Sequence, residues 1–191
     1  MKPEILGRET VYAGYMAVER LRVRLADGAE VVREMERHGD AVAVLPYDPD
    51  ARTGLIVRLF RIPVFDRTSE TALDEACAGM IDGDDDAESD AVRREAMEEL
   101  GVRLGPLESV GRVWSSPGVS AERVSLFIAA FSPADRETDG GGVEGEHEGI
   151  TVIERSLVDL ASDADAGRIA DLKLLTLVLT LRVRKPELFA S

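Results

Sequence analysis

The chain has 191 residues, of which 45% are hydrophobic and 31% charged, and its formal net charge is −14. This composition is typical of a globular protein with one domain and room for a subdomain. Phosphate backbones are held by Lys and Arg, so an acidic chain is a poor candidate for binding nucleic acid. The single cysteine, Cys77, excludes an intrachain disulfide and indicates the reducing cytoplasm.

The first part of the chain predicts short strands. Apolar side chains alternate with polar ones over Val11–Ala17 and Leu21–Leu25, and the turn Asp27-Gly28 follows. We assign residues 1–38 to a small N-terminal antiparallel β subdomain and residues 39–191 to the main domain.

The main domain mixes strands and helices, which favours an α/β or α+β fold. An acidic stretch precedes a helical pattern from about Ala87 to Leu100, which ends at Gly101. The polar residues 132–149 predict a mobile loop. Trp114 and Phe127 are expected in the core. The other predicted elements are strands at Ala41–Pro46, Leu55–Phe60, Val110–Trp114, Val124–Phe131 and Ile150–Ile153, and helices at about 156–163 and 169–184.

No segment predicts contact with a membrane. The most apolar run, Leu172–Val183, is shorter than the roughly twenty residues that a membrane helix needs. Residues 1–20 contain charged and polar residues where a secretory signal would need an apolar stretch.

Three glutamates carry the clearest chemical pattern. Glu95, Glu98 and Glu99 have the spacing i, i+3 and i+4, so a helix places them on one face. Like charges repel, and the face must be fully solvated or bind cations. Oxygen ligands suit Mg²⁺, which carboxylates and substrate phosphates commonly hold together. An isolated triad of this kind is more often a solvated acidic surface.

The surrounding residues make the pattern more specific. Gly79 followed by Arg94–Val102 resembles the Nudix box, G-x5-E-x7-R-E-U-x-E-E-x-G-U, in which U is aliphatic. Two departures stand in its front half. The chain has one extra residue between Gly79 and Arg94, and Asp85 or Asp86 takes the place of the first glutamate. Asp86 could equally be the helix N-cap.

The resemblance implies a Nudix α/β/α sandwich with a mixed β-sheet and a metal site for Mg²⁺, with Mn²⁺ as a substitute. In the ADP-ribose pyrophosphatase branch of the Nudix family, the box glutamates and a backbone carbonyl before the box glycine bind metal. The corresponding residues here are Glu95, Glu99 and the main chain of Ala78, with Glu98 nearby as a catalytic candidate.

Loop motifs narrow the resemblance to the ADP-ribose pyrophosphatase branch, including GDP-mannose pyrophosphatases. The segment Glu75–Asp82 resembles that branch's E-x-x-A-G-x-I/L-D lead-in. The stretch Gly140–Glu146 is similar to a catalytic loop, which implies Glu146 as a further metal ligand and the general base. Its rivals are Glu144 and Glu148, and the alternative for all three is a charged surface loop.

The resemblance implies that four residues outside the box bind substrate: Arg33, Arg61, Glu122 and Lys173. Ser116-Pro117-Gly118 with Glu122, and Gly167–Lys173, resemble loops of the same branch. Arginines of the branch that match Arg33 and Arg61 contact phosphate or the terminal sugar. The alternative for each of these side chains is a surface residue without a role.

The sequence therefore predicts a metal-dependent enzyme that hydrolyses the pyrophosphate of a nucleoside diphosphate sugar, with GDP-mannose favoured. ADP-ribose is the alternative, because Glu36–Gly39 and Leu45–Pro49 look more like ADP-ribose hydrolases. A non-catalytic nucleotide-sensing domain is a different class, but such domains tend to lose box glutamates. A pure interaction protein has no positive support. The resemblance also implies a homodimer in which the N-terminal strands pair between subunits, with the alternative that they are swapped, and residues of one subunit reach the site of the other.

Overall fold

The computed structural model describes residues 1–83, 85–143, 145 and 149–190. The chain divides into two compact units. The first contains Met1–Ala41 together with Arg112–Val124, and the second contains the rest of the chain. The boundary at Ala41 lies near the predicted boundary at residue 38, but the first unit also includes the later segment.

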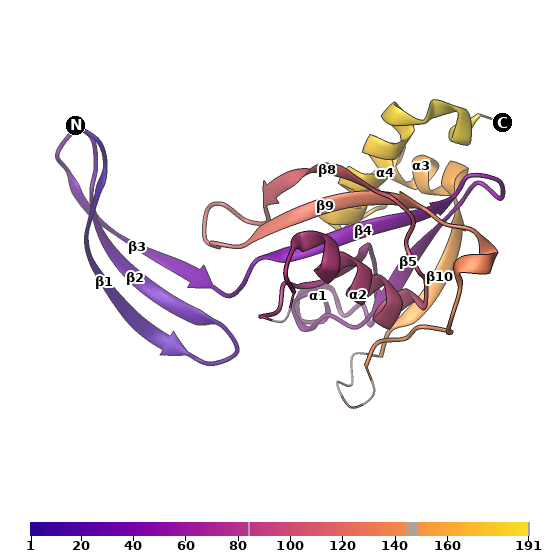
Figure 1. Cartoon of the computed structure of the whole chain (residues 1–191). Helices are drawn as coiled ribbons and strands as arrows, with labels where there is room; N and C mark the ends of the chain where they lie inside the picture. The colour runs from indigo at the N-terminus through magenta and orange to yellow at the C-terminus, as the bar shows by residue number, and fades with distance from the viewer. Residues whose placement is uncertain (84, 144, 146–148, 191) are drawn as a thin grey trace. The chain divides into compact units, whose positions relative to one another are not determined.

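The first unit contains an antiparallel sheet in the order β1-β2-β3 (Figure 1). Its strands are Glu4–Ala13, Ala17–Arg24 and Glu30–Arg37. The predicted strand over Val11–Ala17 is wrong in its second half, because the chain turns there and Gly14 N–H donates to Met16 O at 3.0 Å. Tyr15, which continues the apolar alternation in the sequence, is an exposed residue of this turn.

The larger sheet has the strand order β10-β5-β4-β9-β8, with β6 paired to β5 and β7 paired to β4. Strand β5 pairs antiparallel with β4, β6 and β10. The strands are β4 (Ala41–Asp48), β5 (Thr53–Leu59), β6 (Leu73–Glu75), β7 (Cys77–Met80), β8 (Leu107–Trp114), β9 (Arg123–Ala130) and β10 (Thr151–Ser156).

The structure contains the predicted helices and one further helix, α1. The helix α1 was not predicted, because none of its residues is buried and it shows no apolar stripe. The described residues contain no helix that is long and apolar enough to cross a membrane. The helical elements are α1 (Ile62–Thr68), α2 (Glu88–Leu100), α3 (Leu157–Asp165) and α4 (Leu172–Arg184), with short 3-10 turns at Pro133–Asp135 and Pro186–Phe189.

Successive side chains along the central strands point to opposite faces of the sheet, and each face packs on helices. Val42 and Val44 belong to a core cluster that includes Ala96 of α2. A Cβ added at Gly54 would lie 3.3 Å from side-chain atoms of both Leu45 and Leu157, so the opposite face packs on α3. Helix α2 thus covers one face, while α3 and α4 cover the other (Figure 1). The predicted α/β/α sandwich with a mixed sheet is confirmed.

Two local predictions about the second half of the chain were only partly right. Phe127 is buried as expected, but Trp114 is half exposed at the end of β8, where the Arg123 guanidinium lies 5.4 Å from its ring centroid. The predicted loop 132–149 begins with a 3-10 turn, Pro133–Asp135, in which the Ser132 hydroxyl donates to Asp135.

Candidate active site

Helix α2 holds the three box glutamates at the edge of the core. Its first turn carries Glu88 and Asp90, which favour the positive end of the helix dipole. It ends at Gly101, which adopts the left-handed conformation with φ 68° and caps the helix through its N–H. The apolar side of the helix packs on the sheet, which fixes the direction of the carboxylates.

Glu99 is the most enclosed of the three carboxylates. It is buried, and its Oε2 accepts a hydrogen bond from Ala78 N–H at 3.1 Å. Ala78 lies on β7, so this bond joins the box helix to the strand that precedes the box loop. The predicted metal ligands Glu99 and Ala78 are therefore adjacent in space.

Gly79 provides the space that the Glu95 carboxylate occupies. A Cβ built on Gly79 would lie 1.9 Å from Glu95 Oε1 and 2.0 Å from its Cδ, far inside van der Waals contact. The backbone of Gly79 does not have a positive φ, so conformational freedom is not the reason for glycine here. The box glycine is required because a carboxylate lies directly against it.

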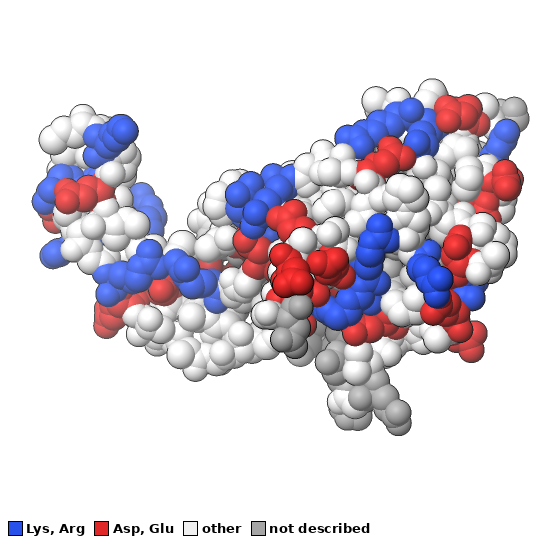
Figure 2. Space-filling model, viewed as in Figure 1, with Lys and Arg blue, Asp and Glu red and all other residues white. Residues whose placement is uncertain are grey.

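Arg94 links the helix to the preceding loop. Its Nη1 donates to Glu95 Oε1 at 2.8 Å and to Glu98 Oε2 at 3.1 Å, and its Nη2 donates to Met80 O at 3.0 Å. Hydrogen bonds from the guanidinium to Asp85 outweigh partial burial and raise the pKa of Arg94. Figure 2 shows acidic side chains gathered over the start of α2, with basic side chains beside them.

Asp85 occupies the place of the first glutamate of the box. Its carboxylate accepts from Arg94 Nη2 at 3.0 Å and from Asp82 N–H at 2.9 Å. The hydrogen bond from Arg94, followed by that from Asp82, lowers the pKa of Asp85. The interpretation of Asp86 as the helix N-cap is wrong, since Ala87 is the N-cap and has no side-chain cap. Asp85 therefore pairs with Arg94.

The electrostatic effect of the glutamates reaches Cys77. Burial, followed by the charge and hydrogen bond of Glu99 and the charges of Glu95 and Glu98, raises the pKa of the Cys77 thiol well above its ordinary value. The thiol is fully buried and stays protonated, so it is not a nucleophile. Cys77 thus belongs to the hydrophobic core beneath the glutamates.

The donor set suits a hard divalent cation that also binds phosphate. Among the described residues, no three Asp, Glu, His or Cys side chains converge closely enough to hold an ion by themselves. Mg²⁺ does not need such a cage, because it is usually held by one or two carboxylates together with water and phosphate oxygens. Glu95, Glu99 and the main chain of Ala78 would provide oxygen ligands of this kind.

The glycine run after the 3-10 turn docks on the end of α2. Gly141 N–H donates to Glu99 O at 2.8 Å, and Gly142 N–H donates to Glu98 O at 3.0 Å. Gly140 has φ 69°, and a Cβ there would lie 2.4 Å from Glu99 O. The last carbonyls of a helix have no partner within the helix, and this segment provides one.

The predicted catalytic glutamates follow this glycine run in the sequence. Glu144, Glu146 and Glu148 lie outside the described residues.

Arg61 and Lys173 meet on a pair of buried carboxylates. Arg61 Nε and Nη2 donate to the two oxygens of Glu75 at 2.7 and 3.1 Å. Lys173 Nζ lies 3.1 Å from Glu75 Oε2 and 2.8 Å from Asp171 Oδ1. The structure therefore brings together two predicted substrate-binding residues from opposite halves of the chain. Glu75 and Asp171 were not predicted as site residues, although both lie in segments, Glu75–Asp82 and Gly167–Lys173, that resemble the branch.

The protonation states of this cluster are strongly coupled. Burial alone would raise the pKa of Glu75, but hydrogen bonds from Arg61 and the charge of Lys173 lower it overall. Burial alone would lower the pKa of Lys173, but the charges of Asp171 and Glu75 raise it overall. The Glu75 carboxylate and the Lys173 ammonium are consequently both charged near neutral pH.

The other two predicted substrate-binding residues lie in the first unit. Arg33 is on β3, and its Nη1 donates to Val32 O at 2.9 Å. Glu122 Oε1 lies 4.0 Å from His38 Nε2, and Glu36 Oε1 lies 3.1 Å from the same nitrogen. Their role in substrate binding stays a prediction.

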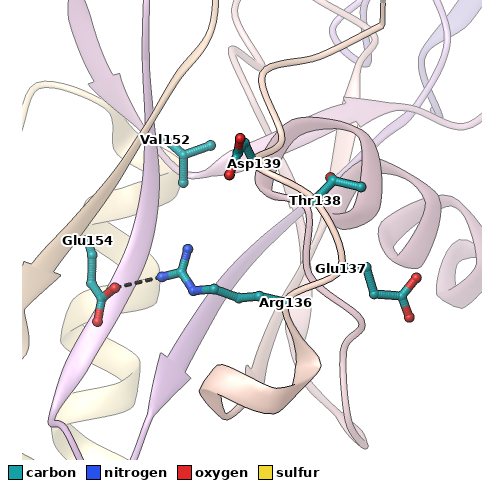
Figure 3. A pocket seen from close by; sticks show the side chains of 6 residues that line it. All are labelled: Arg136, Glu137, Thr138, Asp139, Val152 and Glu154. Carbon is teal, nitrogen blue, oxygen red and sulfur yellow. Dashed lines mark hydrogen bonds and ion pairs between the residues drawn. The ribbon is translucent and has the colours of Figure 1, made fainter.

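A cavity of about 440 Å³ lies between the segment after the 3-10 turn and β10 (Figure 3). Arg136 points across it and donates to Glu154 Oε2 at 2.6 Å, while Glu137 points away. With Asp139 also at its wall, the cavity has no excess of positive charge and is a poor place for a pyrophosphate. The lining residues are Arg136, Glu137, Thr138, Asp139, Val152 and Glu154.

Comparison with known proteins agrees with this geometry. The NUDIX domain matches residues 37–172. The GDP-mannose pyrophosphatase of Cronobacter sakazakii is 35% identical over 153 residues, which cover 80% of this chain and 78% of that protein. A protein of the same name from Klebsiella pneumoniae is 33% identical over 185 residues, covering 95% and 90%.

A solved structure shows the same fold. The crystal structure of an ADP compounds hydrolase superposes with a TM-score of 0.77, covering 98% of this chain and 96% of that one at 18% identity. The family match extends over most of the chain and includes the helix, the box glycine and Arg94. The chain therefore belongs to the Nudix domain family.

Proposed function

We propose that this protein hydrolyses the pyrophosphate bond of a nucleoside diphosphate sugar, with GDP-mannose as the favoured substrate. The observation that carries the proposal is the identity of 30–35% to proteins named GDP-mannose pyrophosphatase, two of which match more than nine tenths of this chain. The carboxylate face of α2 and the cations Arg61 and Lys173 give the proposal its chemistry. The products would be a nucleoside monophosphate and a sugar phosphate.

The proposed cofactor is Mg²⁺, with Mn²⁺ as a substitute, held by Glu95, Glu99 and the main chain of Ala78. When bound, the metal offsets the charge of the pyrophosphate and lowers the pKa of a water molecule. Arg94 keeps Glu95 and Glu98 in position, and Ala78 N–H does the same for Glu99. These contacts support a preorganised face for a polyanionic substrate.

The reaction needs a base for the attacking water. The water oxygen forms a bond to one phosphorus, the bridging phosphorus–oxygen bond breaks, and the second phosphate leaves. The water proton passes to a carboxylate, for which we propose Glu146, with Glu144 and Glu148 as alternatives. Glu98 is the candidate on α2, where its Oε2 accepts a hydrogen bond from Arg94 Nη1 at 3.1 Å.

ADP-ribose is the alternative substrate. Residues 36–39 and 45–49 favour it, and the fold is shared with an ADP compounds hydrolase. A panel of GDP-mannose, ADP-ribose and other nucleotide sugars in Mg²⁺, with released monophosphate as the readout, separates the two. Turnover of GDP-mannose above the others is expected. Tight binding without turnover would instead support a nucleotide-sensing domain.

We also propose that the protein is a homodimer formed through the N-terminal sheet. Ile5, Tyr12 and Val32 on this sheet are each more than half exposed, which leaves an apolar surface to be covered. A molecular mass of twice 20.7 kDa by light scattering at micromolar concentration is the expected result. A mass of one chain would remove the proposal.

The buried, reduced Cys77 supports a cytoplasmic location.

A further inference from the structure

Two buried carboxylates lie beneath the cations Arg61 and Lys173. The side chains of Glu75 and Asp171 are 4% and 6% exposed, whereas those of Arg61 and Lys173 are 44% and 26% exposed. The four formal charges cancel, but they are arranged in layers, with the negative charges inside and the positive charges toward solvent. An anion approaching from solvent would meet the cations first.

The contacts between the layers restrict orientation strongly. Arg61 meets Glu75 through two parallel hydrogen bonds, a geometry that fixes the plane of the guanidinium. Lys173 Nζ is shared by Glu75 and Asp171, which prevents the flexible side chain from turning into solvent. Without these carboxylates, both long side chains would sample many rotamers and binding an anion would cost entropy.

The same carboxylates are connected to the strand that carries the proposed metal ligand. Asp171 Oδ2 accepts from Ala76 N–H and from Leu174 N–H, each at 3.1 Å. Ala76 is two residues before Ala78, whose N–H binds Glu99. The start of α4, the segment Ala76–Ala78 and helix α2 are thus joined by hydrogen bonds to the buried carboxylates of Asp171 and Glu99.

We infer that Glu75 and Asp171 are positioning residues that hold Arg61 and Lys173 as a preoriented phosphate-binding pair beside the box. This inference rests on the proposed function, because it takes a pyrophosphate as the group bound. Glu75 acts through Arg61 and Lys173 and does not itself contact the substrate.

The test measures the binding of inorganic pyrophosphate in Mg²⁺ by titration calorimetry, together with KM and kcat for GDP-mannose. Glu75→Gln keeps the shape of the side chain but replaces one acceptor oxygen with a donor that opposes Arg61. We expect pyrophosphate binding to weaken and KM to rise by about tenfold, the scale of one lost charge-assisted hydrogen bond, with kcat within about threefold. A simple electrostatic view predicts the reverse, because removing a negative charge should tighten anion binding.

Three further variants make the result specific. Arg61→Lys keeps the charge on an exposed side chain but loses the paired hydrogen bonds, so it should weaken binding equally and carries the test if Glu75→Gln does not fold. The double variant should lose little more than either single variant, because both remove the same interaction. Asp74→Asn is the matched control, since it removes a neighbouring charge that pairs with Arg58 instead, and binding should not change.

Pyrophosphate affinity and KM within twofold of the wild type in both Glu75→Gln and Arg61→Lys would overturn the inference, as would tighter binding in Glu75→Gln. The calorimetric measurement does not depend on turnover. A wild-type protein that hydrolyses none of the nucleotide sugars therefore counts against the proposed function, whereas unchanged binding in the variants counts against the positioning role.

Discussion

Gly79→Ala is expected to separate activity from stability. The added Cβ would lie 1.9 Å from Glu95 Oε1, whereas ordinary contact begins at 3.4 Å. The carboxylate must therefore retreat by about 1.5 Å, the difference between these distances. It cannot do so without leaving Arg94 Nη1, to which it is bonded at 2.8 Å. The substitution displaces a proposed metal ligand without altering its chemistry.

The expected effect on stability is small because two contributions oppose each other. Weakening a partly exposed ion pair between Arg94 and Glu95 costs about 1 kcal/mol. Replacing glycine by alanine at a compatible φ stabilises by about 0.4–1 kcal/mol through the unfolded state. The net change is within about 1 kcal/mol, or roughly 2–4 °C in Tm for a chain of this size. Activity should fall about 100-fold, since a misplacement of about 1 Å is worth that much.

The assay is the release of nucleoside monophosphate from GDP-mannose in Mg²⁺, with Tm measured on the same samples. Gly83→Ala is the control, because a Cβ at Gly83 has no atom within 4 Å, and it should retain activity. Gly79→Ala with wild-type turnover would contradict the role of Gly79 in placing the Glu95 carboxylate, and so would a loss of activity that is matched by unfolding.

Two further predictions concern the segments that surround the box. Gly140→Ala should destabilise the protein by about 2–3 kcal/mol, because it adds a clash with Glu99 O to the strain of a positive φ. Gly167→Ala, at a glycine with φ 67° and open space around it, should cost only about 1 kcal/mol. Equal losses of unfolding free energy in urea for the two variants would contradict this prediction. The native pKa of Glu75 lies below its ordinary value of 4.5, so the unfolded chain takes up the proton first on acidification. Its stabilising effect is present at neutral pH and is lost as pH falls through the native pKa. The difference in unfolding free energy between wild type and Glu75→Gln should therefore shrink below about pH 4.5, and a constant difference would show that ionisation of Glu75 does not stabilise the fold.

Local patterns predicted the parts of this protein that depend on neighbours in sequence. The helix over Glu88–Leu100 was predicted because its glutamates, apolar residues and terminal Gly101 follow helical spacing. The shared face of Glu95, Glu98 and Glu99 follows from the same geometry. The exposed helix α1 was missed, since helical amphipathicity requires a buried side and this helix has none.

Contacts between distant segments could not be predicted in the same way. The glycine run at 140–142 suggested mobility, but its N–H groups bind carbonyls of Glu98 and Glu99 some forty residues earlier. No local pattern indicates that contact. Likewise, the meeting of Arg61 with Lys173 over Glu75 depends on the start of α4 lying beside Glu75 and Ala76, which are about a hundred residues earlier. The resemblance selected the two cations as separate candidates, and only the fold shows the carboxylates between them.

The most direct test of the account is Glu99→Gln in Mg²⁺. The carboxamide oxygen can still accept the hydrogen bond from Ala78 N–H, so Tm should stay close to that of the wild type. The loss of a charged oxygen ligand should lower kcat for GDP-mannose by orders of magnitude, on the scale of about 3–4 kcal/mol in the barrier. A Glu99→Gln variant that hydrolyses the substrate at the wild-type rate would contradict metal-dependent catalysis on this face of α2.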